Sequence, residues 1–189
     1  GEHTLNELCR AIDSKTTDFS NIAGIIWPRK GEWIINKPAP LVDLKNIKRP
    51  LRDNYFNPDG FYNNPRLTEF TMFCVETLRG CVNKCAYCCT PAINGSVIRK
   101  FEIQYVIEDL LKIKHQKGKQ IFISDENTLQ DPQHFQELLH SIIDAKLINL
   151  DYQIQTTARD VVKNKNLLPL IKEAGIINIS LGIESFSEA

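Results

Sequence analysis

From about residue 70 onward, short apolar runs of strand length alternate with longer segments of helical periodicity. The four strand-like runs are 72–78, 120–125, 151–157 and 176–183. This alternation is typical of βαβ units, in which a helix connects each strand to the next strand of a parallel sheet. No other feature constrains the fold as strongly, and it predicts an α/β domain.

The segments between these runs carry the signals of amphipathic helices. Apolar residues recur at spacings of three and four in two of them: Val106, Leu110 and Ile113, then Phe135, Leu138, Leu139, Ile142 and Ile143. Asp131 before Pro132 predicts the N-cap of the second helix. A third helix is expected at 167–174, with Pro169 in its first turn and Gly175 after its end. Four βα steps are too few to close an eight-stranded barrel, so we expect a curved open sheet with right-handed crossovers.

The N-terminal third of the chain differs from the rest in residue composition and hydrophobic pattern. A short helical pattern (Leu5, Leu8, Cys9, Ile12) precedes a connection rich in Pro and Asn. This pattern predicts a domain end followed by a linker. Because the chain begins at Gly1 without Met and ends just after the fourth run, we expect it to be part of a longer protein.

Composition limits the class of protein. With 189 residues, of which 42% are hydrophobic, the chain is long enough to bury a sizeable core. Lys+Arg and Asp+Glu are both 23, so no overall field favours nucleic acid or an anionic membrane. The sequence has no apolar run of membrane-spanning length and no signal-peptide layout, and it therefore predicts a cytoplasmic protein. Six cysteines in that compartment indicate ligands or catalysts rather than disulfides.

Three of these cysteines form a spaced constellation. Cys81, Cys85 and Cys88 are separated by four and three residues, directly after the first strand and its Arg79–Gly80 turn. A loop of this length can wrap three thiolates round a cubane iron–sulfur cluster, each thiolate binding one iron and the fourth iron remaining open. Cys89 is a weak candidate for the fourth ligand because adjacent side chains on a tight loop diverge, and Cys74 lies back in the strand.

Two plainer interpretations of the cysteines remain open. Structural zinc needs four N or S ligands, and the loop contains no histidine. His134 and His140 are expected to be solvated positions on the second helix. An inert cysteine cluster is the other alternative, and an electron-transfer protein of ferredoxin type would need a fourth ligand.

The cysteine loop resembles that of a known family. Its Cys-x3-Cys-x2-Cys spacing, with Tyr87 before the third cysteine, is similar to the radical S-adenosylmethionine (SAM) superfamily. The segments 76–80 and 182–185 resemble the branch that carries an N-terminal cobalamin-binding domain. Gly1–Thr4, the helix after it and a strand pair within 25–35 resemble the tail of that Rossmann-like domain. The histidine motif that ligates cobalt is not in this sequence, so cobalamin is implied by kinship alone.

The resemblance implies a division of the chain and a set of cofactors. Residues 1–47 would be the tail of the cobalamin-binding domain with its linker, and 48–189 the N-terminal part of a radical SAM core, a partial (β/α) barrel. Cys81, Cys85 and Cys88 would hold a 4Fe-4S cluster. Its open iron would chelate the amino and carboxylate groups of SAM, and reductive cleavage would give a 5'-deoxyadenosyl radical.

The resemblance also implies cofactor contacts near the cysteines and at the ends of the first two strands. The Tyr87 backbone and ring edge would border the adenine, or the ring would merely pack. Asp125 and Glu126 would meet the ammonium of the methionine moiety, or form a strand-end turn or helix cap.

The last two strands are expected to add further contacts. Thr157 and Arg159 would face the cofactor carboxylate or the substrate, although Arg159 is equally an ordinary surface residue. Glu184 and Ser185 would reach the ribose or the amino group, or lie in a solvated turn. Arg99 and Lys100 are interpreted as solvated charge, and no residue is assigned as catalytic.

The implied activity is a modification at a carbon centre of a small molecule, such as methylation, cyclisation or rearrangement. It would use cobalamin in the full-length protein and a reductant such as flavodoxin or ferredoxin. The alternative enzyme class, a methylthiotransferase, should show three further upstream cysteines, which Cys9 and Cys74 do not supply. The substrate is not specified by the sequence.

Overall fold

The computed structural model describes residues 1–52 and 72–184. The chain divides into two compact units, Gly1–Ile47 and Lys48–Ala189. The assignment of the first unit to the tail of a cobalamin-binding domain stays a prediction.

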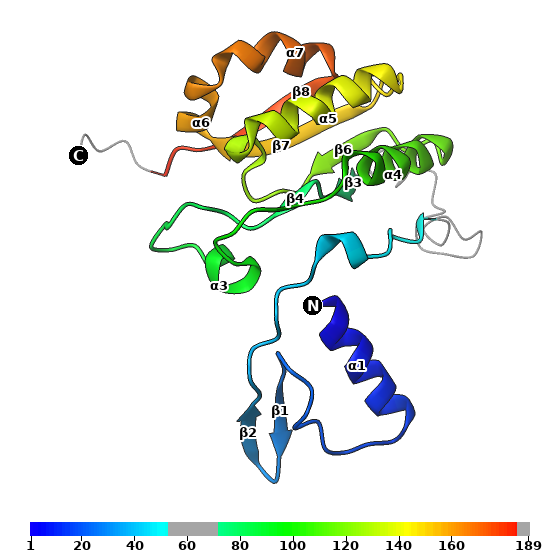
Figure 1. The fold of residues 1–189 in the computed structure, drawn as a ribbon, viewed down its shortest axis with the longest axis vertical. Helices are drawn as coiled ribbons and strands as arrows, with labels where there is room; N and C mark the ends of the chain where they lie inside the picture. Colours follow the sequence, from blue (N-terminus) through cyan, green and yellow to red (C-terminus); the bar gives the residue numbers. More distant parts are fainter. Residues whose placement is uncertain (53–71, 185–189) are drawn as a thin grey trace. The chain divides into compact units, whose positions relative to one another are not determined.

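A four-stranded parallel sheet forms the centre of the second unit (Figure 1). Its strands lie in chain order: β3 (Met72–Val75), β6 (Gln120–Ile123), β7 (Asp151–Thr157) and β8 (Ile176–Gly182). Each strand pairs in parallel with the next, and helices connect them. The α/β prediction and all four predicted strand positions are therefore confirmed.

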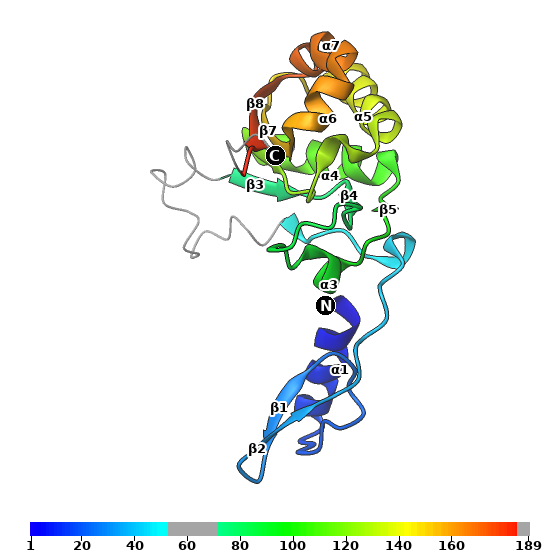
Figure 2. The same cartoon turned by 90° about the vertical axis from the view of Figure 1, so that its left-hand side faces the viewer.

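Three helices cover one face of this sheet: α4 (Ile103–His115), α5 (Pro132–Asp144) and α7 (Leu168–Glu173) (Figure 2). The predicted start of α5 is confirmed, since the Asp131 carboxylate accepts a hydrogen bond from the His134 backbone N–H at 3.0 Å. The sequence did not predict α6 (Ala158–Lys163), whose first turn is capped by the Thr157 hydroxyl.

The two faces of the sheet differ in polarity because side chains alternate along each strand. Ile121, Ile123 and Ile154 are buried on the helix-covered face. On the other face, Gln153 lies opposite Asn178 and Gln155 opposite Ser180 in the β7–β8 register. This second face is therefore polar, and it faces away from the helices.

The first strand is shorter than the predicted run 72–78. β3 ends at Val75, and Leu78–Arg79 instead form β4, which pairs antiparallel with β5 (Arg99–Lys100). The physical reason is Asp125, whose Oδ1 accepts the backbone N–H of Thr77 at 2.7 Å and of Leu78 at 3.1 Å. The backbone N–H groups of Thr77 and Leu78 therefore do not form hydrogen bonds of the parallel sheet.

The first unit consists of α1 (Glu2–Asp13) and a hairpin of β1 (Ile26–Arg29) and β2 (Glu32–Ile35), followed by the 3-10 turn η1 (Leu44–Asn46). The predicted helix and strand pair are confirmed. Trp27 is buried and meets Phe19 edge-on, with ring centroids 5.3 Å apart. The Asn36 amide accepts from the Trp27 indole N–H and donates to the Phe19 carbonyl.

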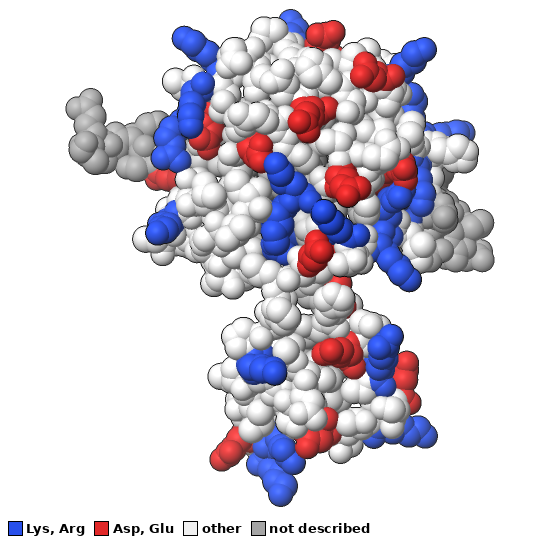
Figure 3. Space-filling view, viewed as in Figure 1, with Lys and Arg blue, Asp and Glu red and all other residues white. Residues whose placement is uncertain are grey.

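Within residues 1–52 and 72–184, no helix has the length and apolar character needed to cross a membrane. Basic and acidic side chains are interspersed over the face shown in Figure 3. This face therefore has no extended region of purely positive or purely negative electrostatic potential, which agrees with the equal numbers of basic and acidic residues in the sequence.

Candidate functional site

The three spaced cysteines lie on one loop that leaves β4 at Gly80 and ends in the short helix α3 (Thr90–Asn94). Cys81 is 9% exposed, whereas Cys85 and Cys88 are exposed. All three line one cavity of about 340 Å³. The predicted metal ligands are therefore brought to a common space.

The remaining wall of this cavity comes from the carboxyl ends of the parallel strands. Glu126 follows β6, Thr157 ends β7, and Glu184 follows β8. Strand ends of a parallel sheet meet at one edge, which is where such folds place their ligands. Tyr87 also lines the cavity. Ser185, predicted beside Glu184, lies outside the described residues.

Several further lining residues were not singled out from the sequence as site residues, among them Asn127, Gln155 and Ser180. Gln155 and Ser180 face each other in the strand register. The alternation of small polar residues along 176–183 was the signal that could have identified Ser180.

The thiol arrangement is compatible with a cluster. Among the described residues, no three Cys, His, Asp or Glu side chains converge closely enough to hold a single metal ion. A cubane has a different requirement, because each thiolate binds a different iron and the thiolates surround the cluster. Hydrogen bonding from Thr90 lowers the pKa of the Cys88 thiol, with the Thr90 backbone N–H 3.4 Å from Sγ. This favours the thiolate, the form that binds metal.

Tyr87 and Glu184 are two polar residues that line the three-cysteine cavity. Partial desolvation, followed by a hydrogen bond and the negative charge from Glu184, raises the pKa of Tyr87 to about 12. The phenol therefore stays protonated near neutral pH, beside the Glu184 carboxylate.

Asp125 has a different place from the one expected for a cofactor contact. Its side chain is fully buried, and it accepts from the backbone of Thr77 and Leu78 and from the Thr77 hydroxyl. Burial raises the pKa of Asp125 to about 7. In this arrangement Asp125 holds the start of the cysteine loop, and Glu126 is the acidic residue of the pair that lines the cavity.

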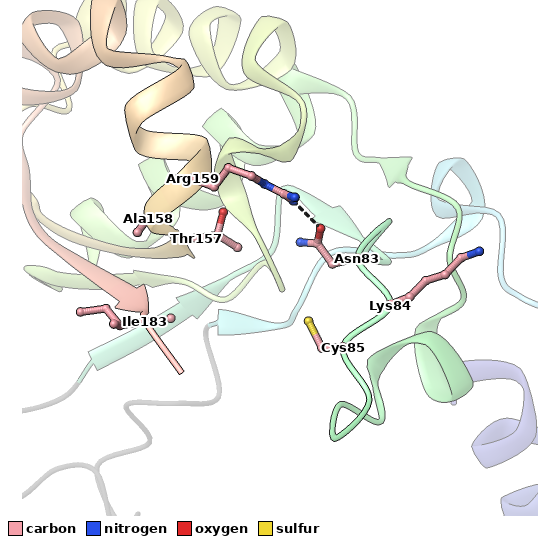
Figure 4. A pocket seen from close by; sticks show the side chains of 8 residues that line it. Asn83, Lys84, Cys85, Thr157, Ala158, Arg159 and Ile183 are labelled. Atoms are coloured by element: carbon pink, nitrogen blue, oxygen red, sulfur yellow. Dashed lines mark hydrogen bonds between the residues drawn. The ribbon is translucent and has the colours of Figure 1, made fainter. Parts of the chain in front are cut away.

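A second hollow of about 550 Å³ adjoins the loop, and Cys85 and Thr157 line both spaces. In Figure 4, Arg159 extends from the first turn of α6 toward Asn83, and its guanidinium donates to Asn83 Oδ1 at 2.8 Å. Lys84 points away from these two side chains. Arg159 thus contacts the cysteine loop directly.

Two predictions for other polar residues were wrong. His134 is not solvated: it is buried, its Nε2 lies 3.2 Å from the Thr77 carbonyl, and burial lowers its pKa. Arg99 is not merely solvated charge, because it donates to the Asn94 carbonyl at 2.9 Å. Lys100 forms an ion pair with Asp131 at 2.9 Å.

The other expectations for single residues concern exposure and position. His140 is exposed, as predicted. Cys89 is exposed and is not among the residues lining the three-cysteine cavity. The Cys74 side chain lines a separate hollow beside Arg52.

A parallel βα sheet with a three-cysteine loop at its carboxyl edge defines an α/β protein of the partial-barrel class. Residues 75–189, more than half of the chain, match the model of the radical SAM superfamily. The chain belongs to this superfamily.

The curated proteins that are similar in sequence include a cyclase and a methyltransferase. The anaerobic magnesium-protoporphyrin IX monomethyl ester cyclase of Synechocystis sp. is 25% identical over 193 residues, covering 100% of this chain and 37% of the cyclase. The cytidylyl-2-hydroxyethylphosphonate methyltransferase of Streptomyces wedmorensis is 26% identical over 158 residues, covering 79% of this chain and 29% of that enzyme.

Two solved structures of the radical SAM methyltransferase TsrM from Kitasatospora setae share the fold. The structure with tryptophan and a SAM analogue has a TM-score of 0.74 at 18% identity, covering 100% of this chain and 37% of that one. The structure with cobalamin and a [4Fe-4S] cluster has a TM-score of 0.69 at 19% identity, covering 99% and 37%. The chain thus spans between 29% and 37% of the length of these relatives.

Proposed function

We propose that Cys81, Cys85 and Cys88 hold a 4Fe-4S cluster and that SAM binds beside it in the same cavity. One observation carries the proposal: the three thiols of one loop share a cavity with polar side chains from the ends of β6, β7 and β8. A volume of about 340 Å³ lies within the range of small-molecule and cofactor sites.

When bound, the cluster supplies one electron that breaks a carbon–sulfur bond of SAM, giving methionine and a 5'-deoxyadenosyl radical. The residues of this chain bind and orient. The carboxylates of Glu126 and Glu184 suit the ammonium group of the methionine moiety through charge-assisted hydrogen bonds. Arg159, at the adjoining hollow, suits a carboxylate of the cofactor or the substrate. Tyr87 borders the adenine.

The whole protein would then modify a carbon centre of a small molecule by a cobalamin-assisted methylation or cyclisation. This is supported by the relatives, one of which is a cyclase and two of which are methyltransferases. Cobalamin would bind largely to sequence outside this chain, with residues 1–47 as the tail of its domain. A flavodoxin or ferredoxin would supply the electron.

Anaerobic reconstitution of the complete protein with iron and sulfide tests this function. We expect about four irons per chain, the stoichiometry of a cubane cluster, together with its visible absorption. With dithionite and SAM, the reconstituted protein should form 5'-deoxyadenosine. A stable site that contains only zinc, with no cluster absorption, would contradict the proposal.

A further inference from the structure

Gln130 holds the peptide backbone on both sides of Cys81. It ends the 3-10 turn η4 (Thr128–Gln130), which follows β6. Its amide Nε2 donates to the Gly80 carbonyl at 2.7 Å, and its Oε1 accepts from the Val82 backbone N–H at 3.3 Å. A single planar side-chain amide thus contacts the residues immediately before and after Cys81.

The backbone of Cys81 itself is held from another direction. Its N–H donates to the Gly95 carbonyl at 3.4 Å, which joins the beginning of the loop to the segment after α3. Glu126 strengthens the same junction, because it accepts from the Gly80 backbone N–H at 3.1 Å and from the Asn94 side chain. Cys81 is accordingly buried, whereas Cys85 and Cys88, farther along the loop, are exposed.

Gln130 is attached to a rigid part of the fold. Thr128 and Leu129, the other two residues of η4, are almost fully buried. The Gln130 backbone N–H donates to the Asn127 carbonyl at 3.2 Å. Gln130 is not among the residues lining the three-cysteine cavity. Its side chain therefore acts on the loop and not on a bound molecule.

We propose that Gln130 is a positioning residue that fixes the backbone of Cys81 and thereby the direction of the first thiolate. Cys85 and Cys88 receive their positions from the rest of the loop and adjust to the cluster. The role of Gln130 in cluster binding rests on the proposed function. Its effect on the backbone of Cys81 does not require a cluster.

The first test uses the complete protein without iron, reduced and kept anaerobic. Gln130→Met retains the length of the side chain and removes both hydrogen bonds. We expect iodoacetamide to alkylate Cys81 about fivefold to thirtyfold faster than in the wild type, the factor that one or two lost hydrogen bonds produce. Alkylation at Cys85 and Cys9, followed in the same digest by mass spectrometry, should not change. Gln136→Met, an equal substitution at an exposed position of α5, is the control.

The second test uses the reconstituted protein. Gln130→Met should release iron to a chelator faster than the wild type and the Gln136→Met control, and the electron paramagnetic resonance signal of its reduced cluster should shift. Wild-type rates of Cys81 alkylation in Gln130→Met would overturn the inference. A less cooperative urea unfolding of Gln130→Met than of Gln136→Met would also overturn it, because the faster alkylation of Cys81 would then come from general loss of folding. If the wild type takes up no cluster, the proposed function fails. The alkylation result still decides whether Gln130 positions the backbone of Cys81.

Discussion

The Asp125 carboxylate accepts the Thr77 backbone N–H at 2.7 Å from a position with no solvent exposure. This contact joins the end of β6 to the segment between β3 and β4. It ends the parallel ladder of β3 and directs the chain toward Gly80 and Cys81. The His134 ring nitrogen lies against the Thr77 carbonyl at 3.2 Å, so both polar groups of the Thr77 backbone are engaged.

The protonation of Asp125 should make the stability of the fold depend on pH. Burial raises its pKa from 3.8 to about 7, so the folded state binds a proton more tightly than the unfolded state does. The stabilisation is complete below about pH 4 and is lost as pH rises toward 7. The free energy of unfolding should decline over this window by an amount on the order of a few kcal/mol.

Asp125→Asn isolates this effect, because its amide resembles the protonated acid and can donate to the Thr77 hydroxyl. Between pH 4 and 7, we expect the free energy of unfolding of the variant to decline less than that of the wild type. At pH 7, the variant should be at least as stable as the wild type. Urea unfolding at several pH values measures both. Identical pH profiles for the two proteins would show that Asp125 is ionised throughout this range.

Cys85 and Cys89 should differ sharply as cluster residues. Cys85→Ala removes the middle thiol of the loop and leaves two ligands, so it should abolish cluster binding and SAM cleavage in the complete protein. Cys89→Ala should retain most of both and cost about 1 kcal/mol of local packing. The measurement is 5'-deoxyadenosine formed with dithionite, normalised to bound iron. Loss of the cluster in both variants would show that the ligand assignment is wrong.

Gly80 should not tolerate a side chain. Its φ is +98°, and an added Cβ would lie 2.4 Å from the Val97 carbonyl oxygen, which is backbone. Gly80→Ala should therefore displace the beginning of the cysteine loop and destabilise the domain by about 1–3 kcal/mol. It should also lower iron uptake on reconstitution.

Gly31→Ala is the control for Gly80→Ala. Gly31 has a φ of +86°, but an added Cβ would meet nothing within 4 Å. It should cost about 1 kcal/mol from backbone conformation alone and leave iron uptake unchanged. Equal effects of the two substitutions on iron uptake would contradict the role assigned to the close approach at Gly80.

The buried ion pair between Arg52 and Asp109 should be intolerant of losing one partner. Both side chains are 4% exposed, with Arg52 Nη2 2.6 Å from Asp109 Oδ2, and Arg52 also donates to the Cys74 carbonyl. Arg52→Met leaves a buried carboxylate without its cation and should cost about 3–5 kcal/mol. The free energy of urea unfolding measures this cost.

Two further variants give this prediction its controls. Arg49→Met breaks a half-exposed pair with Glu108 and should cost less than about 1 kcal/mol. Adding Asp109→Leu to Arg52→Met removes the stranded charge and should recover much of the lost stability. A double variant no more stable than Arg52→Met alone would show that packing, and not charge, determines the cost.

The sequence by itself determined the features that depend on local periodicity and spacing. A short run of strand length predicted β7 at 151–157, and the Asp131–Pro132 pair predicted the start of α5, because strand-like runs and helix caps are properties of neighbouring residues. The spacing of Cys81, Cys85 and Cys88 likewise placed three thiols on one loop.

Only the tertiary structure decided the contacts between residues far apart in the chain. Asp125 and Glu126 are adjacent strand-end carboxylates with no local signal to separate them, yet one is buried against Thr77 and the other lines the cavity. The residues next to His134 in the sequence suit a solvated helix position, but the backbone of Thr77 packs against its ring. The desolvation of a side chain and the orientation of its hydrogen bonds depend on which distant backbone packs against it, and periodicity carries no information about that.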